Sequence, residues 1–255
     1  MSATASMETP PQREMGFLDH LDELRRRIIS GLAGIVVASI GVSFFINEIV
    51  ERILLRPAIE AGLRLQNLRP FGQAFLYFKL IFICGFIIGF PWVLWNLWRF
   101  VAPGLYEHER RWARQITVWT SICFLAGVVF AYFGMIPSMM AFARSFGSAQ
   151  IENIIDVNEY LGFFATVILA SGLIFELPMI MYVLARAGIV TPQFLSTYRR
   201  HAVIVILIIA AVLTPTPDPI NQLFFATPLY ILYELSIVIS KFAVKRRTVA
   251  TGDHQ

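Results

Sequence analysis

Charged residues are scarce in this sequence, and the signatures of several enzyme classes are missing. Charged residues make up 15% of the chain, whereas soluble domains contain about a quarter. The sequence contains no phosphate-binding G-x-x-x-x-G-K-[ST] and no zinc-binding H-E-x-x-H pattern, and its two cysteines have no metal-site spacing. None of its four histidines lies deep in an apolar run, so a serine there would lack a base. We therefore expect neither an enzyme nor a bound metal or cofactor.

Long runs of uncharged, mostly apolar residues make up much of the sequence. Hydrophobic residues make up 57% of the chain, and the mean hydropathy is +0.66. A helix needs about 20 apolar residues to cross the hydrocarbon core of a bilayer. Six runs reach or approach that length, at residues 28–47, 80–98, 115–143, 161–185, 202–217 and 219–240. The sequence therefore predicts an all-α membrane protein with six transmembrane helices in one domain over residues 1–255, with disordered tails at 1–16 and 243–255.

Prolines predict where several of these helices end. Pro103 and Pro137 are expected to end the second and third helices, and Pro57 to break the first outer loop. The apolar run 202–213 covers about 18 Å, less than the hydrocarbon core of about 30 Å. The turn TPTPDP, with Asp218 near its tip, follows at once and prevents a longer helix. Short fifth and sixth helices would thin the bilayer locally or be covered by a partner.

The distribution of arginine and lysine predicts that both termini are cytoplasmic. Of the 21 arginines and lysines, 15 lie on the side of the predicted termini and six on the opposite side. Cytoplasmic loops of membrane proteins carry the excess of these residues. The sequence pI of about 9.3 then reflects membrane topology, so no nucleic-acid partner is needed to explain it.

Acidic residues lie among arginines at two places on this predicted cytoplasmic side. In HLDELRRRI, which begins at His20, Glu23 and Arg27 are spaced to pair on a helix. In RFVAPGLYEHERR, Glu109 lies among arginines a few residues after Phe100. Surface ion pairs would explain each pattern, and acids in a first helical turn also favour the helix dipole. They would not explain why carboxylates lie where cations alone anchor a helix, so both segments are candidate binding sites.

Glu176 lies near the middle of the fourth apolar run, in GLIFELPMI. A lone carboxyl group at that depth is costly and marks a functional site by default, although a structural carboxyl bonded to another helix is the simpler alternative. A proton- or ion-coupled transporter of small solutes would use such a residue, and it would predict inverted repeats in the two halves. A purely structural membrane scaffold would instead predict that Glu23 and Glu109 are dispensable.

Polar residues flank the TPTPDP turn on the opposite side of the membrane. Thr214, Asn221 and Gln222 would form a polar patch there. Their side chains would bond either to each other or to a partner helix, because polar side chains form hydrogen bonds between helices in membranes. The patch is therefore a candidate contact for another subunit.

These features together resemble the TatC family, the multispanning subunit of the twin-arginine protein translocase, over residues 17–242. The family's H-L-x-E-L-R-x-R pattern appears at His20, Leu21, Glu23, Leu24, Arg25 and Arg27. Its F-x-x-P-x-L-x-x-x-E-R pattern appears at Phe100, Pro103, Leu105, Glu109 and Arg110. Its F-E-x-P and L-T-P…D patterns appear at Phe175, Glu176, Pro178, Leu213, Thr214, Pro215 and Asp218.

The resemblance implies a concave bundle and a receptor for the signal peptides of folded proteins, which carry two adjacent arginines. Glu23 and Glu109 would accept the guanidinium groups. The residues that would shape this site are His20, Leu24, Arg25, Phe100 and Pro103. Two such contacts, at roughly 1.5–3 kcal/mol each, would give about two to four decades of affinity. The planar fork of arginine also suits a carboxylate better than lysine does.

The resemblance also implies partners and a location. Transport would be driven by the proton motive force across a bacterial cytoplasmic membrane, in an oligomeric complex with single-span TatA-like and TatB-like subunits. Thr214 and Gln222 would contact these subunits, and Glu176 would line a concave face that receives the apolar part of the signal peptide. Pro57 and Asp218 would belong to the outer loops.

Overall fold

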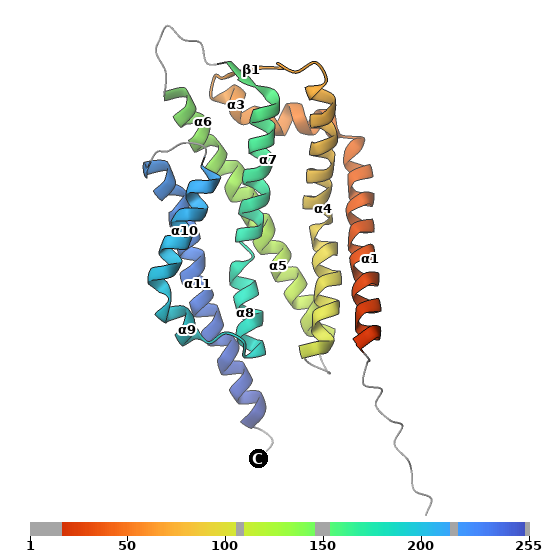
Figure 1. Cartoon of the computed structure of the whole chain (residues 1–255), viewed down its shortest axis with the longest axis vertical. Helices are drawn as coiled ribbons and strands as arrows, with labels where there is room; N and C mark the ends of the chain where they lie inside the picture. Colours follow the sequence, from red (N-terminus) through yellow and green to blue (C-terminus); the bar gives the residue numbers. More distant parts are fainter. Residues whose placement is uncertain (1–16, 106–109, 146–153, 215–218, 253–255) are drawn as a thin grey trace, which may run out of the picture.

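The computed structural model is a bundle of long helices that run along one axis (Figure 1). It describes residues 17–105, 110–145, 154–214 and 219–252. The long helices are α1 (Phe17–Ser43), α4 (Gly72–Leu105), α5 (Arg110–Phe130), α7 (Val157–Ile174), α8 (Leu177–Ala187), α10 (Arg199–Leu213) and α11 (Pro219–Gly252). The shorter elements are α2 (Ile46–Ile49), the π-helix η1 (Val50–Leu54), α3 (Arg56–Glu60), β1 (Arg64–Gln66), the π-helix η2 (Ala131–Met135), α6 (Ile136–Ser145), β2 (Ile154–Asp156) and α9 (Pro192–Thr197).

Five helical segments are long and apolar enough to cross a membrane. They are Leu21–Ser43, Gly72–Phe100, Arg114–Ser145, Val157–Ala187 and Gln222–Ala243. The remaining helix of the predicted six is α10, which has 15 residues and covers about 22 Å at roughly 1.5 Å per residue. It is the short fifth helix that the sequence predicts. α1 begins and α11 ends at one end of the bundle, the terminal end, while β1 and α3 lie at the opposite, distal end (Figure 1).

The last helix, α11, is longer than predicted. It has 34 residues, so the expectation of a short sixth helix is wrong, and helix extends to Gly252 where a disordered tail is expected from residue 243. The residues between Ala243 and Gly252 include neither proline nor glycine and contain several good helix formers, which permit the helix to continue. Its apolar segment, Gln222–Ala243, has 22 residues, enough to cross the hydrocarbon core.

The third transmembrane helix continues through Pro137, contrary to the prediction that it ends there. α5 passes into η2 and then into α6, which begins at Ile136. Pro137 therefore lies in the first turn of α6, after a π-helical segment has shifted the hydrogen-bond register. The Ser138 hydroxyl donates to the Gly134 carbonyl at 2.7 Å and satisfies a backbone acceptor beside the proline.

Glycines allow α1 to pack closely along α4 (Figure 1). A Cβ atom at Gly34 would overlap the ring of Trp92, and one at Gly85 would overlap Ser39. Small residues at helix interfaces in membranes permit such a close approach. The register of α1 on α4 is consequently fixed, and with it the geometry at the terminal end of the pair.

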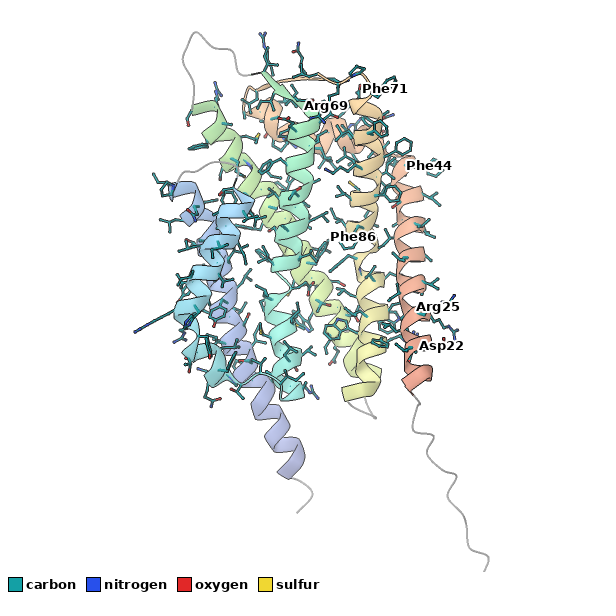
Figure 2. The ribbon with its side chains drawn as sticks, in the orientation of Figure 1. Asp22, Arg25, Phe44, Arg69, Phe71 and Phe86 are labelled. Atoms are coloured by element: carbon teal, nitrogen blue, oxygen red, sulfur yellow. The ribbon has the colours of Figure 1, made fainter. Side chains whose placement is uncertain are left out.

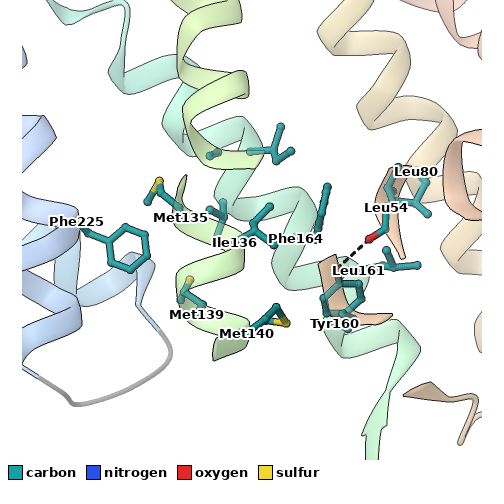
Figure 3. Packing of buried hydrophobic residues seen from close by; sticks show 14 of the residues in the cluster. Leu54, Leu80, Met135, Ile136, Met139, Met140, Tyr160, Leu161, Phe164 and Phe225 are labelled. Atoms are coloured by element: carbon teal, nitrogen blue, oxygen red, sulfur yellow. Dashed lines mark hydrogen bonds between the residues drawn. The ribbon is translucent and has the colours of Figure 1, made fainter. Parts of the chain in front are cut away.

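The main buried core lies toward the distal end, where α7 meets α4 and the third transmembrane helix (Figure 3). Leu80, Ile136 and Leu161 are fully buried there. The Tyr160 hydroxyl donates to the Leu54 carbonyl at 2.8 Å. This bond fastens η1, which lies across the distal end, to the start of α7.

A parallel pair of short strands links two distal loops. Arg64 of β1 lies opposite Ile154 of β2, and Gln66 lies opposite Asp156. Each strand has three residues, which is too short to show a periodic pattern, so the sequence does not predict the pair. The pairing holds the start of α7 beside the loop that precedes α4.

Candidate functional site

A pocket of about 580 Å³ opens at the terminal end, between the first turns of α1 and the last turns of α4. Its lining residues are Asp22, Glu23, Arg26, Arg27, Ser30, Trp92, Trp95, Asn96 and Arg99. Figure 2 shows Asp22 and Arg25 on α1 at this end of the molecule. The pocket thus combines carboxylates, guanidinium groups and indole rings at the place where the sequence predicts an acidic binding site.

Glu23 forms an ion pair that a ligand can replace. Nη2 of Arg27 donates to Oε1 of Glu23 at 3.0 Å, and both side chains are 23% exposed. The predicted pairing of these two residues is therefore confirmed. The Nε atom of Arg27 is buried and has no partner among the described residues. Because i,i+4 ion pairs on a helix contribute only about 0.3–0.5 kcal/mol, a second guanidinium group can take the place of Arg27 at little cost.

Tryptophans on α4 form the opposite wall of the pocket. Nε1 of Trp92 donates to the Ser30 carbonyl at 2.9 Å, and Nδ2 of Asn96 donates to the Trp92 carbonyl at 2.9 Å. The guanidinium carbon of Arg99 lies 5.9 Å from the centroid of the Trp95 ring, within the range of a cation–π contact. The wall already holds one arginine and is chemically suited to hold another.

The tryptophan wall was not predicted from the sequence. Trp92, Trp95, Asn96 and Arg99 are spaced at i, i+3, i+4 and i+7, so they share one helical face. The i, i+3, i+4, i+7 spacing can be recognised in the sequence. The apolar run 80–98 predicts a membrane helix, however, and does not indicate which of its faces forms a binding site. The relation of the wall to Glu23 depends on the packing of α1 against α4.

The structure describes some of the other residues predicted for this site and not others. Arg25 is exposed on α1, Leu24 is half-buried next to Glu23, and Phe100 is half-buried in α4. The structure does not describe the side chains of His20 and Pro103, nor any part of Glu109. The structure therefore brings Glu23 to the end of α4 that carries Phe100. The convergence of Glu23 with Glu109 stays a prediction.

Glu176 lies where the fourth transmembrane helix breaks. α7 ends at Ile174 and α8 begins at Leu177, with Pro178 in the first turn of α8, where a proline needs no donor. The Glu176 side chain is 4% exposed, and its Oε1 atom has no partner among the described residues. Glu176 is thus buried within the bundle, and its place on a concave face that receives the signal peptide stays a prediction.

The helix break at Glu176 is packed tightly against α5. The Ser171 hydroxyl donates to the Gly127 carbonyl at 2.9 Å, and a Cβ atom at Gly127 would lie 2.6 Å from the Ser171 carbonyl oxygen. The Phe124 ring, which lies against Gly172, stacks on Phe90 of α4 with 3.7 Å between centroids. An unpartnered carboxyl oxygen is costly in such surroundings, which favours a functional role for Glu176.

One of the two predicted partner-contact residues, Gln222, bonds α11 to α10, whereas Thr214 bonds within the end of α10 itself. The Thr214 hydroxyl donates to the backbone carbonyl four residues earlier at 2.9 Å. Nε2 of Gln222 donates to the Leu207 carbonyl at 3.0 Å, so both side chains bond to the backbone of α10 and not to each other. At the other end of α10, Nη2 of Arg199 donates to Oε2 of Glu234 at 2.9 Å. The short helix is therefore attached to α11 at its first residue and near its middle, at Leu207.

Asp156, at the distal end, is bonded on several sides. Its Oδ1 atom accepts from the backbone N–H of Asn158 at 3.0 Å and from the Asn158 side chain at 2.8 Å. Nε of Arg69 lies 3.6 Å from its Oδ2 atom. These bonds hold the pKa of Asp156 below its usual value, and the bond from the Asn158 backbone has the largest effect. Asp156 is the N-cap of α7, so its bonds order this corner of the fold.

The two remaining predicted positions belong to the outer loops. Pro57 is buried in the first turn of α3, so it begins a short helix within the loop that it was expected to break. Arg56 and Glu60 form an exposed ion pair beside it at 2.6 Å, which raises the pKa of Arg56. Asp218 lies outside the described residues, so its role in a turn stays a prediction.

Known proteins resemble this chain over nearly its whole length. The family profile described as Sec-independent protein translocase protein (TatC) matches residues 19–228. The Sec-independent protein translocase protein TatC of Deinococcus radiodurans is 37% identical over 245 residues, which cover 93% of this chain and 90% of that protein. The TatC protein of Carboxydothermus hydrogenoformans is 38% identical over 240 residues, which cover 92% of this chain and 96% of that protein.

Solved structures agree with these sequence matches. A crystal structure of the twin arginine translocase receptor TatC superposes with a TM-score of 0.77 at 33% identity, and covers 88% of this chain and 99% of that one. A second crystal structure of that receptor, in DDM, superposes with a TM-score of 0.78 at 32% identity. The resemblance carried by the four sequence motifs is thereby confirmed, and the chain belongs to the TatC family of Sec-independent protein translocase proteins.

Proposed function

We propose that this chain is the receptor subunit of a twin-arginine translocase and binds the signal peptides of folded proteins through their arginine pair. The observation that carries the proposal is the position of Glu23, partly exposed in the terminal-end pocket and paired with Arg27 at 3.0 Å. The solved relative is itself described as a twin arginine translocase receptor. The pocket offers what an arginine side chain requires, a carboxylate beside indole rings.

Binding would proceed by exchange of one guanidinium group for another. The first arginine of the signal would replace Arg27 on the Glu23 carboxylate and stack on the α4 wall near Trp95. Glu109 would accept the second arginine. A guanidinium group donates two parallel hydrogen bonds to a carboxylate, which a lysine ammonium group cannot do in that geometry. The acids lie among arginines because the ligand is basic and the native arginines hold the carboxylates in place until it arrives.

The terminal end would face the cytoplasm of a bacterial cell, in keeping with the excess of arginine and lysine on that side. Cargo would then meet the pocket before crossing the cytoplasmic membrane, and the proton motive force would drive the transport. Glu176, whose Oε1 atom lacks a partner among the described residues, would bond to a polar group brought by the signal peptide or by a partner helix.

Single-span TatA-like and TatB-like subunits would dock along α10, in an oligomeric complex. This helix has 15 residues, fewer than the roughly 20 needed to span the hydrocarbon core. A partner helix beside it would cover a thinned part of the bilayer. Gln222 supports this edge because its bond to Leu207 links α10 to α11, and Thr214 supports it because its hydroxyl bonds to the last turn of α10.

Affinity capture of a signal peptide by the detergent-solubilised protein tests the receptor proposal. The peptide would carry either Arg-Arg or Lys-Lys, and the protein would be the wild type or the double variant Glu23→Ala, Glu109→Ala. Glu51→Ala is the matched control, because this acid is exposed at the distal end. We expect capture to require both the arginine pair and the two glutamates, and to be unaffected in the control.

Unchanged capture by the double variant would favour the transporter or the structural scaffold over the receptor. If the double variant captures the Arg-Arg peptide as well as the wild type does, these acids are ordinary surface pairs. A transporter that depends on Glu176 would then explain the buried carboxyl better, and solute uptake by reconstituted vesicles would become the measurement to make.

A further inference from the structure

The distal end carries a second pocket whose chemistry the receptor function does not use. It has a volume of about 390 Å³ and lies between the start of α4 and the start of α7. Arg69, Lys79 and Asn158 supply its polar groups, and Phe71, Phe75 and Leu76 supply its apolar wall. Figure 2 shows Arg69 and Phe71 at the end of the molecule opposite Asp22. The pocket is therefore remote from the terminal-end site.

Lys79 is the cation of this pocket that has no carboxylate partner among the described residues. Arg69 has two carboxylates near it, with Nε 3.6 Å from Asp156 and Nη2 3.8 Å from Glu159. Lys79 forms no ion pair with a carboxylate among the described residues. Its Nζ atom lies 3.4 Å from the place where a Cβ atom of Gly162 would be. The ammonium group thus rests on the seam between α4 and α7.

The depth of Lys79 places this charge at the edge of the bilayer. Lys79 is seven residues after the first residue of α4, about 10 Å along the helix axis, and within the segment Gly72–Phe100 that can span a membrane. A lysine near the end of a membrane helix extends its ammonium group toward the polar surface. A cation at this level attracts the negatively charged group that is present there, the phosphate of a lipid.

The walls of the pocket match the rest of a phospholipid molecule. Phe71 and Phe75 are 76% and 74% exposed, and Leu76 is buried beneath them. Aromatic side chains at the membrane surface pack against the boundary between lipid headgroups and acyl chains. The close approach of α4 to α7 is fixed at Gly72, where a Cβ atom would lie 2.6 Å from Nδ2 of Asn158, so the pocket is part of the rigid fold.

We propose that this pocket binds an anionic phospholipid of the leaflet at the distal end. The phosphate lies between Lys79 and Arg69, the Asn158 amide is near the headgroup, and the acyl chains run along the exposed rings of Phe71 and Phe75. The bound lipid supplies a counter-charge to Lys79 and fills the seam between α4 and α7. A free phosphate ion would leave the apolar wall exposed, which is why the occupant is a lipid.

Native mass spectrometry of the purified full-length chain tests the proposal. The protein would be incubated with equal amounts of phosphatidylglycerol and phosphatidylcholine that carry identical acyl chains. We expect the wild type to retain phosphatidylglycerol preferentially, and Lys79→Gln to lower that preference about fivefold, because one cation near an anionic headgroup is worth about that factor. Lys79→Arg should keep the preference, which also shows that the position tolerates substitution.

Three results would overturn the proposal. In the first, Lys79→Gln retains phosphatidylglycerol as the wild type does, and the pocket then holds no lipid. Arg52→Gln, which removes an exposed charge from η1 at the same end, could lower the preference equally, and the effect would then be a general surface potential. Millimolar inorganic phosphate could abolish the preference in the wild type, and the pocket would then be a site for a free anion. No signal peptide enters this assay, so its outcome is independent of the receptor proposal.

Discussion

Two carboxylates, one at each end of the bundle, are held in opposite ways. Asp156 at the distal end is 7% exposed, accepts two bonds from Asn158 and lies beside Arg69. Glu23 at the terminal end lies in an open pocket and accepts from Arg27. A carboxylate can accept about four hydrogen bonds. The comparison shows that a buried carboxylate bonded by neighbouring residues orders the chain around it, whereas one in an open pocket with spare acceptor capacity is available to a ligand.

The strongest test of this comparison is the substitution Glu23→Ala. It should weaken binding of an Arg-Arg signal peptide about 10- to 100-fold, because it removes a hydrogen-bonded charge pair worth roughly 1.5–3 kcal/mol. The melting temperature should stay nearly unchanged, since an i,i+4 ion pair on a helix adds only about 0.3–0.5 kcal/mol. Fluorescence anisotropy of a labelled peptide and thermal unfolding in the same detergent provide the two measurements.

Arg27→Ala sharpens the same test. If Arg27 holds the place of the ligand's guanidinium group, its removal should leave peptide binding unchanged or strengthen it by up to about fivefold. A loss of binding in Arg27→Ala comparable to that in Glu23→Ala would contradict the exchange and would make Arg27 a positioning residue of the site.

Asp156→Ala should lower thermal stability and leave peptide binding unchanged, the reverse of the effects expected for Glu23→Ala. It removes the N-cap of α7 together with the bonds to Asn158, so we expect the melting temperature to fall by several degrees. Peptide binding at the terminal end should not change. A variant that melts like the wild type would show that the distal network is not a determinant of stability, and the contrast between the two carboxylates would be lost.

The pH dependence of stability offers a finer test at Asp156. Its bonds lower its pKa in the folded protein from the usual 3.8, so its stabilising contribution is complete above that value and is lost as the pH falls through the lower folded pKa. Asp156→Asn keeps a capping side chain but does not titrate. Between about pH 6 and about pH 3 the wild type should therefore lose more thermal stability than Asp156→Asn, and parallel curves would argue against the assignment.

Features that depend on a long local pattern were predictable from the sequence. Apolar runs of about 20 residues have few other interpretations, and the short α10 follows from the prolines of TPTPDP. The pairing of Glu23 with Arg27 is a local i,i+4 relation. The strand pair and the tryptophan wall were not predictable, because Arg64 and Ile154, or Glu23 and Trp95, are far apart in the sequence. The continuation of the helix through Pro137 depended on the π-helical register of η2, for which the sequence offers no simple signal.

By itself, the amino-acid sequence determined that the chain spans a membrane with helices in a known order, and which acids lie near its ends or within it. The tertiary structure alone decided the state of each acid: Glu23 in an open pocket, Glu176 buried with an unpartnered oxygen, and Asp156 bonded on several sides. The physical reason is that hydrophobic length is a property of consecutive residues, whereas burial and hydrogen bonding depend on side chains that distant helices bring together.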